Sequence, residues 1–263
     1  MTTSSEEARA LQHSDTPARA PGDRHTQLTD GDQHTASASA LAGSNDDNAV
    51  RAKAFESIGP EEFASIIFGD AFTPDRRLVV SRFGPDGSSA WCSSPEQAAQ
   101  VVQAIDAVGN VYMGCCLMRA AAEAPGKRGS SEDTVAMGAV WADVDVGTEG
   151  HSADKNYPPT LNEALDHMAR RIEQRPSIIV ETGGGAHLWW LLDEPLIFET
   201  EADRACGAEL VQRWQLRIRQ VWAEKGWDLD SAHDLARVLR PPRTRNHKHN
   251  PPRPVRVTAW DVI

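Results

Sequence analysis

The chain has 263 residues, of which 40% are hydrophobic and 25% charged, a composition typical of globular rather than fibrous or membrane-spanning proteins. With 38 acidic against 27 basic residues, its formal net charge of −11 argues against a protein that coats nucleic acid through bulk charge. No apolar run approaches the roughly 18 residues of a membrane-spanning helix, and the N-terminus lacks a signal-peptide pattern. We therefore expect a cytoplasmic protein with no membrane partner.

The first 50 residues differ in composition from the rest of the chain. They contain no aromatic residue and carry eight acidic against three basic residues, so they hold −5 of the net charge of −11. Such a segment cannot bury enough apolar surface to offset the entropy cost of ordering it. We predict a disordered acidic leader at 1–50 and a folded domain at 51–263.

The first half of the folded region predicts two helices and three strands. Prolines at their first turns indicate the helices, and two apolar runs joined by a turn sequence indicate a hairpin. In chain order, we expect a helix after Gly59-Pro60 that buries Phe63, Ile66 and Ile67, a hairpin of strands 78–83 and 90–92, a helix from Ser94-Pro95 to about Ala107, and a strand over 110–118.

The second half predicts further strands and two more helices. We expect strands over 137–147, 176–182, 186–192 and near 255–260, a helix capped by Thr160 and Glu163 that runs to about Ile172, and a helix from Thr200 to about Lys225 that carries Leu210, Val211, Trp214, Ile218 and Trp222 on its apolar face. Strands and helices alternate without a uniform β-α-β rhythm. The predicted fold class is therefore α/β with a mixed, α+β-like sheet.

The cysteines give no sign of a metal site or of a disulfide framework. None of Cys92, Cys115, Cys116 and Cys206 forms a C-x-x-C pair, and two of them are adjacent. Zinc sites and disulfide frameworks use other spacings. We expect buried thiols and no zinc.

The first candidate site is a pair of acidic residues at the end of an apolar strand. Asp143 and Asp145 alternate along VWADVDVG, so their carboxylates point to the same face. Two like charges that close are stabilised by a cation, and carboxylate oxygens suit Mg²⁺ or Mn²⁺. The alternative is an exposed strand end with two solvated acids.

The second candidate site is a glycine-rich connection followed by a histidine, in TGGGAHLWW. Glycines such as Gly184 and Gly185 let the backbone approach a ligand, and successive N–H groups can cradle phosphate. His187 follows on the next strand. The alternative is a flexible hairpin with a core histidine. Trp189 and Trp190 face opposite sides, so we expect both to serve packing.

The third candidate site is a segment in which the charges separate by sign. Three acids, Asp228, Asp230 and Asp234, precede a stretch from Leu235 to Trp260 that holds seven basic residues and no acid. Arginines bind phosphate and carboxylates hold metal, so the pattern is typical of a polyphosphate–metal site. The alternative is a solvated basic loop.

Together, these motifs resemble those of the archaeo-eukaryotic primase superfamily, specifically the primase-polymerases of phages, plasmids and mobile elements. The matching motifs stand in order: VWADVDVG, ETGGGAHLWWLL and WDLDSAHDLARVLR, followed by RVLRPPRTRNHK from Arg237 to Lys248. The resemblance covers roughly Phe55 to the C-terminus. One position departs from the pattern, because Arg243 stands where the family has glycine, which affects the expected geometry of 241–246.

The resemblance implies a primase-type catalytic core, in which an RRM-like sheet packs against an N-terminal α/β module. The expected parts are 51–135 and 136–263, with the catalytic cleft between them. The implied activity is template-directed primer synthesis and extension through a two-metal site that uses Mg²⁺ or Mn²⁺. The implied partners are single-stranded DNA, ribo- or deoxynucleoside triphosphates, and a replicative helicase, either in cis or as a separate chain, since this sequence contains no P-loop.

The resemblance also assigns roles to individual residues. Catalytic and metal-ligand roles fall to Asp143, Asp145 and Asp230, with Asp234 as the second choice for the third carboxylate. Nucleotide contacts fall to His187, Gly184, Gly185, Arg237, Arg240, Asn246 and Lys248, and DNA contacts to Arg128, Arg243 and Arg245. Two other functions use the same features: a metal-dependent nuclease or phosphohydrolase, and a non-catalytic protein that binds a replication origin.

Overall fold

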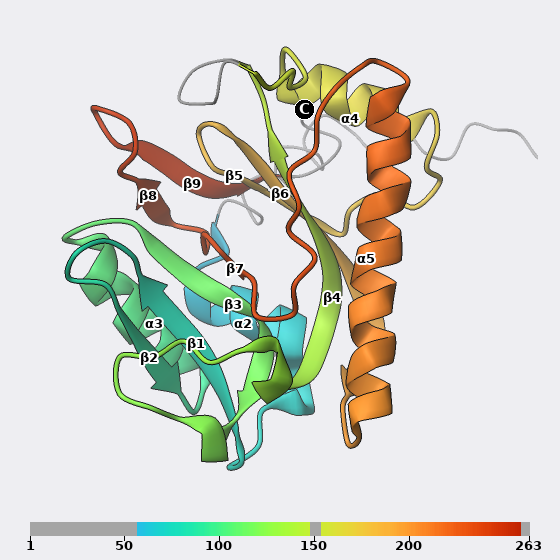
Figure 1. Cartoon of the computed structure of the whole chain (residues 1–263). Coiled ribbons are helices and arrows are strands. Elements are labelled where there is room, and N and C mark those ends of the chain that lie inside the picture. Colours follow the sequence, from blue (N-terminus) through green and yellow to red (C-terminus); the bar gives the residue numbers. More distant parts are fainter. Residues whose placement is uncertain (1–56, 148–153, 259–263) are drawn as a thin grey trace, which may run out of the picture. The chain divides into compact units, whose positions relative to one another are not determined.

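Four α-helices and nine strands make up the described part of the chain, residues 57–147 and 154–258 of this computed structural model (Figure 1). The chain divides into units 1–42 and 43–263, and all described residues belong to the second. The leader expected at 1–50 lies outside the described residues. None of the described helices is both long enough and apolar enough to cross a membrane.

The strands form one antiparallel sheet in the order β2-β1-β3-β4-β6-β5-β9-β8, with β7 beside β3. Their bounds are β1 Arg76–Arg82, β2 Ser88–Cys92, β3 Val111–Arg119, β4 Thr134–Asp145, β5 Ile178–Glu181, β6 Gly185–Ile197, β7 Val238–Leu239, β8 Thr244–Asn246 and β9 Arg253–Thr258.

The helices are α2 Pro60–Phe68, α3 Pro95–Asp106, α4 Leu161–Ala169 and α5 Glu201–Ala223, with short 3₁₀ turns at Gly69–Ala71, Ala120–Ala122 and Ser131–Asp133. Their starts follow from local chemistry. Ser94 accepts a hydrogen bond from the Gln97 N–H at the start of α3, and Thr200 and Asp203 form a capping box at the start of α5. The α/β class with a mixed arrangement of strands and helices is confirmed.

Helices cover both faces of β4 and β6. Trp189 packs edge-on against Phe63 of α2, with ring centroids 5.4 Å apart, whereas Trp190 packs edge-on against Trp214 of α5, at 5.0 Å. The two adjacent tryptophans therefore point to opposite faces and are buried in packing, as expected. Most of β4 and the first six residues of β6 are buried, because helices pack on both of their faces.

Three side chains expected in the core are exposed instead. Ile66 is 40% and Leu210 is 38% exposed, and Cys206 is also exposed. The first two lie one position off the buried face of their helix, which passes through Phe63 and Ile67 in α2 and through Val211 and Ile218 in α5. A stripe about 100° wide excludes such neighbours even when they are apolar.

Strand β3 changes partner along its length. It pairs with β4 only at Leu117 and Met118, and with β7 at Met113 and Gly114. Between these contacts, the Cys115 N–H donates to the Arg237 carbonyl, at 2.8 Å. The segment that carries β7 thus takes the place that β4 leaves, and it brings the basic residues around it close to the end of β4.

Candidate active site

A cleft of about 580 Å³ lies where β4 ends, and it gathers residues from five separate segments of the chain. Its lining comprises Asp143 and Asp145 of β4, Lys155 and Tyr157, Thr182, Gly184 and His187, Asp230, Arg240, Asn246, Lys248, His249 and Asn250. Each of the three candidate sites of the sequence contributes to this lining. The structure therefore brings most of the predicted functional residues together.

Strand pairing positions the first acidic residues. Asp143 lies opposite His187 and Asp145 lies opposite Gly185 in the antiparallel ladder of β4 and β6. A Cβ on Gly185 would lie 2.0 Å from the Val144 carbonyl oxygen, so only glycine permits this approach of the two strands. Gly185 thus supports the site through packing and does not line the cleft itself, whereas Gly184 does.

Burial controls the protonation of Asp143 and His187. It raises the pKa of the Asp143 carboxyl, and the positive charges of Arg240 and Arg237 partly oppose this. Burial lowers the pKa of His187 to about 3, and the Arg240 charge acts in the same direction. The imidazole is therefore neutral near pH 7, and its contact with Asp143, 3.5 Å from Nε2 to Oδ1, is not an ion pair at that pH.

A hydrogen-bond bridge holds the segment that carries Asp230. Gln215 of α5 donates to the Trp141 carbonyl, at 3.3 Å, and accepts from the Ala232 N–H, at 3.0 Å. The Trp141 indole in turn donates to the Ala232 carbonyl, at 2.7 Å. All of these groups are buried, so the bridge ties 230–232 to β4 and sets Asp230 at the cleft.

Asp230 has a cationic partner that the sequence did not indicate. The Lys155 Nζ lies 3.2 Å from Oδ1 of Asp230, and this contact raises the pKa of the lysine. Burial and then Asp230 raise the pKa of the neighbouring Tyr157, so its hydroxyl stays protonated. Lys155 and Tyr157 both line the cleft.

Arg240 is a buried cation whose Nε is a buried donor without a hydrogen-bond partner. Its guanidinium lies 4.9 Å from the centre of the Tyr112 ring and donates to the Tyr112 hydroxyl, at 2.9 Å, and to Asn110 Oδ1, at 3.2 Å. The side chain is held rigidly, yet its Nε is buried and has no hydrogen-bond partner. Buried donors are normally satisfied, so an unpaired one in a cleft favours a ligand.

Asn246 ends β8, and Lys248 lies in the loop that follows it. The buried Asn246 amide donates to the Thr182 carbonyl, at 2.8 Å, and its oxygen accepts from the Lys248 N–H, at 3.2 Å. These bonds join the loop to the glycine-rich connection. Lys248 is exposed at the cleft, where its charge faces the acidic residues.

Asp234 and Arg237, two residues predicted for the site, pair with each other outside the cleft. Asp234 forms an ion pair with Arg237, at 2.7 Å, and Arg237 also donates to the Ser231 carbonyl. Neither residue lines the cleft. Of the two choices for a third carboxylate, Asp230 lines the cleft and Asp234 does not.

The arginines expected to contact DNA also lie outside the cleft. Arg243 donates to the Ser57 carbonyl, at 3.2 Å, and Arg245 pairs with Asp106, at 3.5 Å. Both border a separate pocket of about 490 Å³ between α2, α3 and β8. Arg128 lies above the ring of Phe83, at 5.9 Å.

The turn at Arg243 has the backbone conformation of a glycine turn, although the residue is an arginine. Arg243 has a φ of 56° and is the one non-glycine residue with positive φ in 57–147 and 154–258. Its N–H donates to the Val255 carbonyl, at 2.8 Å. This left-handed conformation is the one that glycine adopts most easily, so the turn keeps the geometry of a glycine turn with an arginine in it.

Sequence reasoning missed five of the lining residues: Lys155, Tyr157, Thr182, His249 and Asn250. The first two lie in a polar segment with no periodicity, and the only signal there is that Tyr157 is one of just two tyrosines in the chain. Their role depends on contact with Asp230, which is far away in the sequence.

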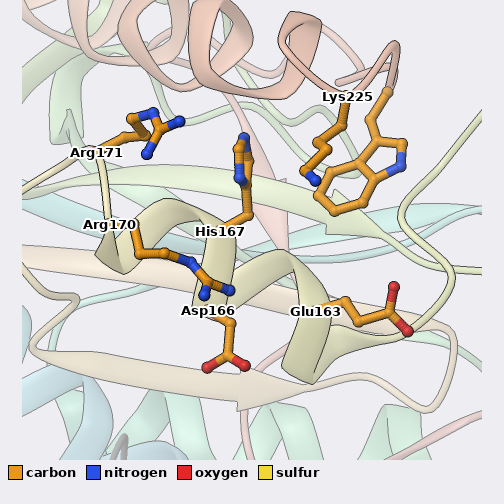
Figure 2. A pocket seen from close by; sticks show the side chains of 7 residues that line it. Glu163, Asp166, His167, Arg170, Arg171 and Lys225 are labelled. Carbon is orange, nitrogen blue, oxygen red and sulfur yellow. The ribbon is translucent and has the colours of Figure 1, made fainter.

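A third pocket, of about 370 Å³, lies between α4 and the end of α5 (Figure 2). In Figure 2, His167 points toward α5, whereas Asp166 points away from it and Glu163 extends to the side. The His167 ring donates from Nε2 to the Val221 carbonyl, at 2.9 Å, and Arg171 pairs with Glu224, at 2.8 Å. These groups join two helices, so this pocket is a poor candidate for chemistry.

The donor set of the cleft fits a divalent cation that arrives with phosphate. Asp143 and Asp145 offer carboxylate oxygens on one strand face. No group of three or more His, Cys, Asp or Glu side chains in the described residues is spaced to hold a metal ion, and Asp230 is paired with Lys155. Mg²⁺ is commonly held by one or two carboxylates and completed by substrate phosphates, which agrees with this pair.

Comparison with known proteins gives one distant likeness. No protein-family model matches the chain, and no curated protein does. Among solved structures, the chain is similar to the archaeo-eukaryotic primase domain of the primase-polymerase of cyanophage S-2L. The TM-score is 0.47 and the identity 16%, over 70% of this chain and 80% of that one. What the cleft does has therefore to be inferred from its own side chains.

Proposed function

We propose that the protein is a DNA primase/polymerase, a nucleotidyltransferase that makes and extends primers on single-stranded DNA in the replication of a phage, plasmid or mobile element. The observation that supports this most is the composition of the cleft. Three carboxylates, Asp143, Asp145 and Asp230, share one cleft with the cations Lys155, Arg240 and Lys248. The order of the sequence motifs supports it independently.

The charge balance of the cleft explains why the activity should depend on metal. Three acidic side chains face three basic ones, so the lining alone offers no net positive charge to a triphosphate. A nucleoside triphosphate brings several negative charges, and burying them without compensation is costly. Mg²⁺ or Mn²⁺ held by Asp143 and Asp145 would supply that charge and promote attack by a 3′-hydroxyl on the α-phosphate, with pyrophosphate as the leaving group.

The basic residues bind and orient the triphosphate in this proposal. Arg240 is fixed by Tyr112 and Asn110, so little side-chain entropy is lost when its guanidinium binds a phosphate at the cleft. Lys248 adds a flexible charge at the exposed side of the cleft. His187, neutral because of burial, contributes hydrogen bonding without charge beside Asp143.

Asp230 serves as the third carboxylate in this proposal. Its partner Lys155 neutralises it in the absence of substrate, which keeps three acids from repelling one another. When Asp230 turns to the cation, the ammonium group of Lys155 becomes available to a phosphate. Asn246 keeps the loop that carries Lys248 close to the glycine-rich connection.

The test is nucleotide incorporation on single-stranded templates, with and without a primer, in Mg²⁺ or Mn²⁺ and with labelled nucleotides of both sugar types. We expect incorporation by the wild-type protein and none by the Asp143→Asn/Asp145→Asn double variant. Asp193→Asn, an exposed acid in the outer half of β6, is the matched control and should retain activity.

Two results would replace the proposal by another function. Metal-dependent degradation of a labelled single strand, with added nucleotides ignored, would indicate a nuclease or phosphohydrolase. Metal-independent binding of origin DNA that tolerates loss of Asp143 would indicate a non-catalytic origin-binding protein.

A further inference from the structure

Four side chains form a row from the protein surface to the cleft, with two adjacent aromatic rings between two arginines. Arg128 lies above the Phe83 ring, at 5.9 Å, and the Phe83 and Tyr112 rings are 5.1 Å apart and tilted by 52°. Arg240 lies above the Tyr112 ring, at 4.9 Å. The last member lines the cleft and the first is near the surface, so the row connects the two.

The row lies on the face of the sheet that α2 and α3 leave open. Helix α3 packs on the face of β1 that carries Leu78 and Val80, where both are part of the main core. Ser81, which pairs with Tyr112 in the β1–β3 ladder, lies on the other face, and by alternation Phe83 does too. Phe83 is 52% exposed, whereas most large apolar residues nearby are buried.

The loop that carries Arg128 is fixed to the same face. The Trp91 indole donates to the Lys127 carbonyl, at 2.7 Å. Gly129 has a φ of +83°, and a Cβ there would lie 3.0 Å from the Trp91 ring, so the loop packs closely on it. A capping box between Ser130 and Asp133 closes the other end. Arg128 is therefore held above Phe83 by structure on both sides.

We propose that Phe83, supported by Tyr112 and flanked by Arg128, is a docking platform for single-stranded DNA that leads the template to the cleft. The proposal rests on the proposed function for naming the strand as a template. An exposed ring offers a face to an unpaired base, and the arginine offers charge to the adjacent phosphate. Duplex DNA keeps its base faces stacked, so only a single strand can use both groups.

A purely structural role does not explain the exposed ring of Phe83 or the position of Arg128 above it. If the rings served only to cover Arg240, Tyr112 would suffice, because it already supplies the stacking face and the hydroxyl contact. Phe83 adds exposed apolar area beyond that contact, and Arg128 adds charge above it. Both additions suit a base with its phosphate.

The experiment measures binding of fluorescein-labelled oligo(dT) of about 12 nucleotides by anisotropy, in EDTA and without nucleotides, alongside an abasic strand of equal length. We expect Phe83→Ala to weaken oligo(dT) binding about 5- to 100-fold, and to leave binding of the abasic strand unchanged, because stacking needs a base. Phe83→Trp should restore oligo(dT) binding. Leu216→Ala, another exposed apolar residue but on α5, is the control and should bind as wild type.

Arg128→Ala should behave differently from the Phe83 variant. Loss of a phosphate contact weakens oligo(dT) and abasic strands alike and lowers the slope of log affinity against log salt by about one. Thermal unfolding of each variant checks that folding is intact. Unchanged oligo(dT) affinity in folded Phe83→Ala, or an equal loss for the abasic strand, would overturn the platform.

The incorporation assay separates this proposal from the proposed function. Wild-type incorporation together with unaltered oligo(dT) binding by Phe83→Ala would reject the platform alone. Phe83-dependent binding of oligo(dT) by a wild-type protein that incorporates no nucleotide would reject the polymerase function and retain the platform. Absence of both binding and incorporation would reject both.

Discussion

Asp143 and His187 face each other across β4 and β6, with Oδ1 and Nε2 3.5 Å apart and the imidazole buried. Burial disfavours the charged form of both groups, so it raises the pKa of Asp143 and lowers that of His187. The pair thus offers one neutral hydrogen-bonding ring next to one carboxylate that a cation would stabilise.

His187→Ala should affect nucleotide use more than template binding. The variant removes a neutral hydrogen-bonding group from the cleft, so we expect the nucleotide KM to rise by about tenfold, as for one lost hydrogen bond. It leaves the docking platform of Phe83, Tyr112 and Arg128 unchanged. Template affinity, measured by anisotropy, should stay within twofold. The nucleotide KM of His187→Gln, which keeps a polar side chain, should lie between those of the wild-type protein and His187→Ala. Equal losses in nucleotide and template binding would instead indicate a structural histidine.

Stability of the metal-free protein should depend on pH through His187. The folded pKa of about 3 lies below the ordinary value of 6.5, so the unfolded chain binds the extra proton in between. The stabilisation is complete above pH 6.5 and is lost as the pH falls toward 3. Relative to His187→Gln, the wild-type free energy of unfolding should fall by up to about 1.4 kcal/mol per pH unit below pH ~6. Urea titrations of both proteins from pH 7 to 4 measure it, and parallel curves would contradict the assignment.

Asp230 and Asp234 form a matched pair for identifying the third carboxylate. Asp230→Asn should lower the incorporation rate at least about 100-fold, as expected for loss of a ligand that stabilises transition-state charge. Asp234→Asn should stay within a few-fold, since its carboxylate is engaged by Arg237 outside the cleft. Because this ion pair is partly exposed, its loss should cost at most about 1 kcal/mol of stability. A larger loss of activity in Asp234→Asn would reverse the assignment.

Arg243 tests the left-handed turn. Arg243→Gly relieves the backbone but removes the hydrogen bond to Ser57, so these effects should nearly cancel, within about 1 kcal/mol. Arg243→Val keeps neither the hydrogen bond nor an easy left-handed conformation, and should destabilise by about 1–3 kcal/mol. Chemical denaturation of the two variants gives the comparison. Equal stability of glycine and valine would show that position 243 carries no backbone strain.

Local patterns were enough to place the first acidic pair. Alternation along a strand put Asp143 and Asp145 on one side, and the glycine-rich connection predicted the antiparallel neighbour that carries His187. Caps at Ser94, Thr160 and Thr200 located the helix starts, because these signals lie within three or four residues of their targets.

The remaining features depend on contacts between distant residues, which one sequence does not encode locally. Lys155 meets Asp230, and Arg240 meets Tyr112, only after the sheet has formed. The prediction that Ile66 and Leu210 are buried was wrong for a different reason. Apolar character alone does not decide whether a residue at the border of the buried face of a helix is covered.

The two residues of β7 have a consequence for the newly made chain. Without Val238 and Leu239 in place, the first part of β3 would present backbone groups with no strand beside them on the β4 side. Such an exposed edge invites pairing with other chains and aggregation. Arg237 and Arg240 flank these two residues, so the step that seals the edge also delivers the buried arginine to the cleft. The same short segment therefore covers the edge of β3 and places Arg240 at the cleft.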